Sequence, residues 1–96
     1  MKTDIQSLIP GKQYSVTVPL NEITDDSLYI GYEGDKSYFK TSDGRYAIVP
    51  CSEIQVSHHN RITLNGLFDV RPNEHFISKK DLKTIRELEG LLKEVA

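Results

Sequence analysis

Aromatic and basic side chains are interleaved in the stretch LYIGYEGDKSYFKTSDGRYAIV, residues 28–49. Aromatic rings stack on nucleic-acid bases while Lys and Arg contact phosphates, and Tyr and Arg are equally common anchors of protein interfaces. An ordinary solvated strand would also use them, because Tyr favours strands and Lys favours water. If the stretch is a three-stranded sheet, the candidate partner-binding residues share the face away from the core: Tyr29, Lys36, Tyr38, Lys40 and Arg45.

A second basic cluster opens the last predicted helix and comprises Lys79, Lys80, Lys83 and Arg86. A helix favours cations at its C-terminal end, so this placement costs a few tenths of a kcal/mol. That mild conflict indicates an anionic partner, although a solvated helix face offset by neighbouring carboxylates is the simpler interpretation. If the partner is a nucleic acid, the candidate contacts are this cluster's Lys79, Lys80 and Lys83, or else Lys36, Lys40 and Arg45 of the aromatic stretch.

Cys51, His58, His59 and His75 carry the groups that could bind a metal or act as a nucleophile. Adjacent residues of a strand point to opposite faces, so His58 and His59 would share an ion only in a turn. No zinc-binding spacing is present, and nothing beside Cys51 would lower the pKa of its thiol. We predict no metal site and no cofactor, and the role of the three histidines is left open.

Carboxylates gather in predicted loops and turns, with Asp25 and Asp26 in a polar loop over 21–27 and Asp35 in a turn. Nothing places two of them across a cleft for general acid–base chemistry. A phosphate-binding loop leads into the N-terminus of a helix, and no helix follows the glycines of this region. We therefore predict that the protein is not an enzyme.

Two turns set the register of the aromatic stretch. Gly34-Asp35 and Asp43-Gly44 are typical of two-residue hairpin loops, because Gly and Asp tolerate positive φ angles. With both loops of that length, Ile30 faces Phe39, and Phe39 faces Ile48 in the core.

Leucine and isoleucine recur at helical spacing near the end of the chain, in Leu82, Ile85 and Leu88. Ser78 is a good N-cap, whereas Gly90 weakens the helix interior by about 1 kcal/mol unless it admits another segment.

We predict an α+β fold, a small antiparallel β-rich meander or barrel-like sheet with one C-terminal amphipathic helix. One domain spans 1–96, strand-rich over 13–70 and helical over about 78–95. Whether the helix packs on its own sheet or on a second copy stays open, as does a homo-oligomer.

The composition is that of an ordinary globular domain, with 96 residues, 38% hydrophobic and 27% charged, and a net charge of −2. That balance gives no general attraction to nucleic acid or to an anionic membrane. The single cysteine indicates a reducing compartment. No apolar run approaches the roughly 20 residues of a membrane helix or forms a signal peptide. We predict a cytoplasmic protein that does not bind membranes.

Two segments resemble the LytTR type of DNA-binding domain. VPLNEI, followed by the aromatic stretch with its DG turn, is similar to that family's opening strands. HFISKKDLKTI, residues 75–85, resembles its closing strand and helix, where a Ser and two basic residues precede the helix. The resemblance implies a largely β fold and DNA contacts at Lys79 and Lys80. The family's Phe-x-Arg-x-His-Arg-Ser run has no counterpart, since FDVRPNEHFIS keeps little beyond Phe68.

These observations predict a non-catalytic binding module, a small regulatory or inhibitory protein that contacts another protein through the Tyr29/Tyr38 face. The alternative is a nucleic-acid-binding transcriptional regulator that resembles a LytTR-type domain. Net charge favours the protein partner, and the resemblance favours the nucleic acid.

Overall fold

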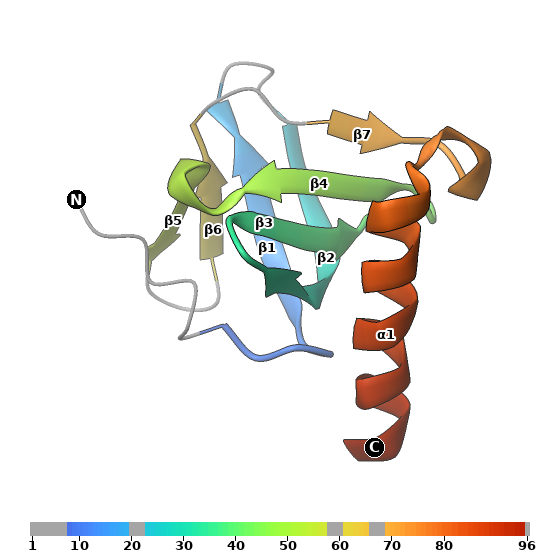
Figure 1. The fold of residues 1–96 in the computed structure, drawn as a ribbon. Helices are drawn as coiled ribbons and strands as arrows, with labels where there is room; N and C mark the ends of the chain where they lie inside the picture. The colour runs from blue at the N-terminus through green and yellow to red at the C-terminus, as the bar shows by residue number, and fades with distance from the viewer. Residues whose placement is uncertain (1–7, 20–22, 58–60, 66–68, 96) are drawn as a thin grey trace.

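A computed structural model describes residues 8–19, 23–57, 61–65 and 69–95. Over these residues the chain forms one seven-stranded sheet and one C-terminal α-helix, an α+β fold as predicted (Figure 1). The elements in chain order are β1 (Gln13–Val18), β2 (Ile23–Glu33), β3 (Lys36–Lys40), β4 (Tyr46–Pro50), the 3-10 helix η3 (Cys51–Glu53), β5 (Ile54–Ser57), β6 (Arg61–Leu64), β7 (Asp69–Arg71), the 3-10 helix η4 (Glu74–Phe76) and α1 (Lys79–Val95).

The sheet has the strand order β5-β6-β1-β2-β3-β4-β7 and is not closed. Neighbouring strands are antiparallel except β1 and β6, which run parallel. In the part of the chain that the structure describes, no helix is long and apolar enough to cross a membrane.

One face of the sheet carries the larger core, here called the first core. Alternating residues of β1, β5 and β6 supply most of it, with Tyr29, Phe39 and Val49 from the central strands. Tyr29 stacks edge-on against Tyr14 and at a tilt against Phe39, with ring centroids 6.4 and 5.2 Å apart. Aromatic pairs at such separations are stabilising beyond the area they bury.

Helix α1 covers the opposite face of β2, β3 and β4 and builds a second core there (Figure 1). Its members are Ile30, Tyr38, Tyr46 and Ile48 from the sheet, Ile77 from the segment before the helix and Ile85 from α1, with Leu82 and Leu88 packed at the edge. The helix therefore packs on its own sheet, and the three central strands are buried on both faces. Gly90 faces open space, so it admits no neighbouring segment among the described residues.

The first hairpin has the predicted two-residue loop, since Glu33 pairs with Lys36. A β-bulge between Tyr29 and Gly31 then shifts the register, and Phe39 pairs with Tyr29 where Ile30 was predicted. The bulge inserts one extra residue into β2. A one-residue shift exchanges the faces of all the residues beyond it, so Tyr29 enters the first core and Ile30 the second.

The second hairpin has a longer loop than predicted. Thr41 N donates to the Arg45 carbonyl over 2.8 Å, which leaves the three residues 42–44 as the loop. Gly44 there has a φ of +87°, the left-handed conformation that such loops require. Phe39 therefore pairs with Ala47, and the predicted Phe39–Ile48 pairing is wrong.

Candidate functional site

The predicted aromatic face is not a solvent-exposed surface. Tyr29 is 0% exposed and Tyr38 is 2% exposed. Lys36, Tyr38 and Lys40 do share one face of β3, but that face carries the second core, while Tyr29 points to the other. The prediction of exposed tyrosines is wrong because the bulge moves Tyr29 and α1 covers Tyr38. Whether Lys36, Lys40 and Arg45 contact a partner stays a prediction.

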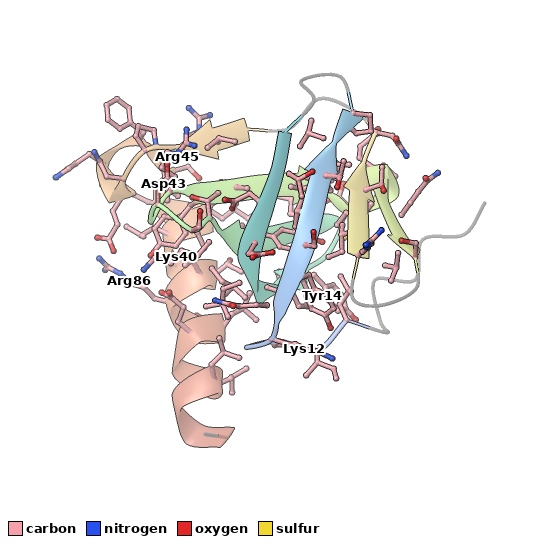
Figure 2. The ribbon with its side chains drawn as sticks, turned by 180° about the vertical axis from the view of Figure 1, so that it is seen from behind. Lys12, Tyr14, Lys40, Asp43, Arg45 and Arg86 are labelled. Atoms are coloured by element: carbon pink, nitrogen blue, oxygen red, sulfur yellow. The ribbon has the colours of Figure 1, made fainter. Side chains whose placement is uncertain are left out.

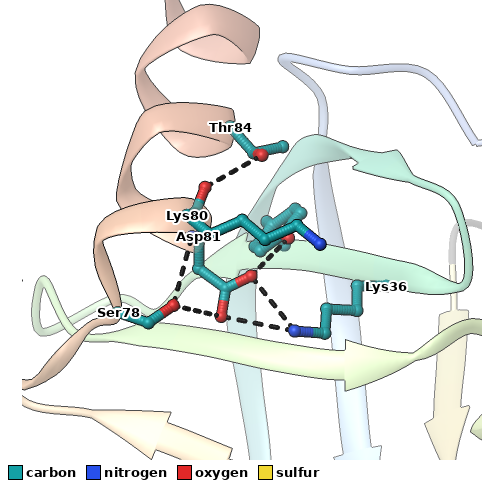
Figure 3. Close-up of polar contacts among 6 residues, drawn as sticks. Lys36, Ser78, Lys80, Asp81 and Thr84 are labelled. Atoms are coloured by element: carbon teal, nitrogen blue, oxygen red, sulfur yellow. Dashed lines mark hydrogen bonds and ion pairs between the residues drawn. The ribbon is translucent and has the colours of Figure 1, made fainter.

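The polar tip of Tyr38 joins the sheet to the start of α1. Its hydroxyl donates to Asp81 Oδ1 over 2.9 Å. Lys36 Nζ lies 3.2 Å from the same oxygen (Figure 3). Ser78 Oγ donates to Asp81 Oδ2 over 3.1 Å and accepts from the Asp81 amide, which caps the helix. These contacts hold α1 in a fixed position against β3.

Asp81 is buried and ionised within this cluster. Burial alone would raise the pKa of its carboxyl, but the hydrogen bonds from Tyr38, Lys36 and Ser78 outweigh it and lower that pKa. Burial, and then the hydrogen bond to Asp81, raise the pKa of Tyr38. The Tyr38, Lys36, Ser78 and Asp81 side chains hydrogen-bond to one another. We therefore assign this cluster a structural role, which is to hold α1 against the sheet.

The other two predicted cations also have partners of their own (Figure 2). Lys40 Nζ lies 5.5 Å from the centroid of the Tyr46 ring, a cation–π distance. Arg45 Nε lies 2.8 Å from Asp43 Oδ2, and about half of each side chain is exposed. Because Tyr29 and Tyr38 are buried on opposite faces of the sheet, the five predicted partner-binding residues do not form one continuous exposed patch.

The basic cluster of α1 forms a surface that faces solvent. Lys79, Lys80, Lys83 and Arg86, here called the basic helix face, are all exposed. Lys79, Lys83 and Arg86, with Leu82 and Glu87, line a surface hollow of about 460 Å³. Arg86 pairs with Glu74 over 3.3 Å, whereas the three lysines have no acidic partner among the described residues.

The sheet also holds a pocket of about 290 Å³ on its first-core face. Its walls include Val16, Phe39 and Leu64, and its polar lining includes Asp25 and Arg45. Of the predicted site residues only Arg45 lies here. Asp25 was missed because residues 21–27 were predicted as a loop, whereas β2 begins at Ile23. The alternation of Asp25, Ser27 and Tyr29 was the signal that could have placed Asp25 on this face.

Of the residues considered for metal or nucleophilic chemistry, the structure describes Cys51 and His75, and no contact joins these two. Cys51 Sγ lies 3.1 Å from Ser37 Oγ, and His75 is exposed in η4. His58 and His59 lie outside the described residues. No group of three or more His, Cys, Asp or Glu side chains that could hold a metal occurs in the described ranges.

Comparisons with protein-family models, with curated proteins and with solved structures found no match to this chain.

Proposed function

We propose that this protein is a non-catalytic binding module that contacts a nucleic acid through the basic helix face. The observation that carries this proposal is the arrangement of its cations. Four exposed positive side chains occupy just over two turns of α1, and three of them border one hollow. Clustered cations attract phosphates even when the net charge of a protein is slightly negative.

The position of the lysines along the helix supports a role in binding. Lys79 and Lys80 are the first two residues of α1, next to the positive end of the helix dipole. Cations at that end do not stabilise the helix, and no described carboxylate pairs with these two. Their positive charge is therefore left available to an anion.

Two further observations support a nucleic-acid partner. Phe76 is 58% exposed in η4, three residues before Lys79, where its ring could stack on a base. The segment 75–85 also resembles the LytTR-type domain, which implies contacts at Lys79 and Lys80. The Asp81 cluster fixes this surface on a rigid helix, as a recognition surface requires.

A protein partner is the second candidate. Phe76 and Leu91 are large apolar side chains, 58% and 55% exposed, and such residues anchor protein interfaces. The original basis for this candidate, an exposed Tyr29/Tyr38 face, is absent because both rings are buried.

The test is binding of fluorescently labelled single- and double-stranded DNA and RNA, measured by anisotropy at two salt concentrations. The variant Lys79→Gln/Lys83→Gln should bind more weakly, and the slope of log affinity against log salt should become shallower by about 2, because roughly 0.9 ions are released per phosphate contact. The matched control is Lys12→Gln/Arg61→Gln, which removes the same charge from two other exposed residues.

Equal losses in the two double variants would show that general charge, and not the basic helix face, drives binding. Salt-insensitive capture of a protein that depends on Phe76 would instead favour the second candidate.

A further inference from the structure

The pocket on the first-core face has an apolar wall interrupted by one carboxylate. Val16, Phe39, Ala47 and Leu64 line it and are themselves at most 6% exposed. Asp25 stands directly opposite Val16 in the β1–β2 pair, so its side chain leaves the same face of the sheet. A core face does not ordinarily carry an acidic residue, because removing a charge from water is costly.

Among the described residues, neutral groups alone donate hydrogen bonds to the Asp25 carboxylate. Ser27 Oγ donates to Oδ2 over 2.9 Å, the Ser42 amide donates to Oδ2 over 3.1 Å, and the Ser42 hydroxyl donates to Oδ1. Burial alone would raise the pKa of Asp25, but these hydrogen bonds outweigh it and lower that pKa. Asp25 is therefore an ionised carboxylate fixed in the pocket wall.

No described cation neutralises that carboxylate. Arg45 is the basic residue of the pocket lining, and its guanidinium pairs with Asp43. Asp43 also acts on Asp25 as a like charge. The described charges at the pocket, those of Asp25, Asp43 and Arg45, thus leave a negative excess. Oδ1 retains an acceptor position beyond the Ser42 hydroxyl.

We infer that this pocket binds a small ligand with a compact apolar body and a terminal ammonium group, with the ammonium against Asp25. The apolar body would lie against Val16, Phe39 and Leu64, as in most small-molecule sites. A pocket of about 290 Å³ accommodates on the order of ten non-hydrogen atoms, since a water molecule takes about 30 Å³ in the liquid. This site is separate from the basic helix face and does not depend on the proposed function.

Three probes of nearly one shape test the inference: phenethylamine, 2-phenylethanol and phenylacetate, which end in an ammonium, a hydroxyl and a carboxylate. Each is titrated into the intact protein while backbone amide chemical shifts are followed. Phenethylamine should bind about three- to tenfold more tightly than the alcohol, as a partly exposed ion pair contributes, and phenylacetate most weakly. The shifts should centre on Val16, Phe39 and Ala47.

The variant Asp25→Asn should bind phenethylamine and the alcohol equally, because the isosteric amide carries no charge. Asp26→Asn removes the same charge from an exposed neighbour that does not line the pocket, and it should keep the preference. Lys79→Gln/Lys83→Gln should keep it too.

Equal binding of all three probes by the unmodified protein would overturn the inference, as would a preference for phenylacetate. So would the absence of shift changes up to about 10 mM, a concentration at which millimolar binders are well populated. Because the three probes are compared on the unmodified chain, these outcomes hold even if Asp25→Asn does not fold.

Discussion

The Tyr38 hydroxyl donates to Asp81 Oδ1 over 2.9 Å and joins the middle of strand β3 to the first turn of helix α1. The two residues are 43 positions apart in the chain. Both are buried, so neither group can exchange this hydrogen bond for water without moving. The contact fixes the N-terminal end of the helix, where the basic helix face begins.

Replacing Tyr38 by Phe should therefore destabilise the protein by about 1.5–3 kcal/mol, the range for a hydrogen bond to a charged group. Urea unfolding at neutral pH gives the free energy of unfolding. Tyr32→Phe is the matched control, because Tyr32 is 40% exposed and should change stability by less than about 0.5 kcal/mol. Equal effects at the two sites would mean that the Tyr38–Asp81 contact does not stabilise the fold.

The other fully buried tyrosine should respond in the opposite way. The Tyr29 hydroxyl is buried and makes no hydrogen bond to any described residue. Tyr29→Phe keeps the ring contacts with Tyr14 and Phe39 and removes an unsatisfied polar group, so the free energy of unfolding should stay constant or rise by up to about 1 kcal/mol. A loss of more than 1 kcal/mol would reveal a partner for this hydroxyl.

Stability should decline in acid partly through Asp81. The pKa of this carboxyl is lowered in the folded protein from its ordinary value of 3.8, so the unfolded chain takes up the proton first as the pH falls. The contribution of the Asp81 carboxylate to the free energy of unfolding is present above about pH 4. It is lost as the pH falls through the pKa of Asp81 in the folded protein. Asp25 and Asp43 act in the same direction.

The measurement is the free energy of unfolding of the unmodified protein and of Asp81→Asn between neutral pH and about pH 2. The difference between the two proteins should be largest at neutral pH and should shrink in acid. A difference that does not vary with pH would show that the Asp81 charge contributes nothing to stability.

The sequence predicted the elements better than the surfaces they present. The period of Leu82, Ile85 and Leu88 predicted α1, since a helix of that pattern must bury one face. The register depended on two details that composition leaves open. Asp43-Gly44 fits a two- or a three-residue loop, and an isolated Gly31 in a strand is only a hint of a bulge.

The candidate sites followed the register. The missed bulge put Tyr29 on the wrong face and α1 covers Tyr38, so the predicted aromatic surface was lost. Lys79, Lys80 and Lys83 kept their predicted exposure because helical periodicity, unlike strand register, does not depend on a distant turn. Strand alternation could have placed Asp25 on the first-core face, but the sequence does not reveal that Ser42, in the β3–β4 loop, hydrogen-bonds to its carboxylate.

Two glycines test how α1 sits on the sheet. Gly31 has a φ of +146°, and a Cβ there would lie 3.1 Å from Leu88 Cδ2. Gly31→Ala should therefore lower the free energy of unfolding by about 1–3 kcal/mol, from backbone strain together with displacement of the helix.

Gly90 lies inside α1 with nothing near its Cβ position. Gly90→Ala should therefore raise the free energy of unfolding by about 0.5–1 kcal/mol through helix propensity. Both free energies come from urea unfolding. If Gly31→Ala were neutral, the bulge and the approach of Leu88 to it would be wrong; if Gly90→Ala were destabilising, another segment must pack against that side of the helix.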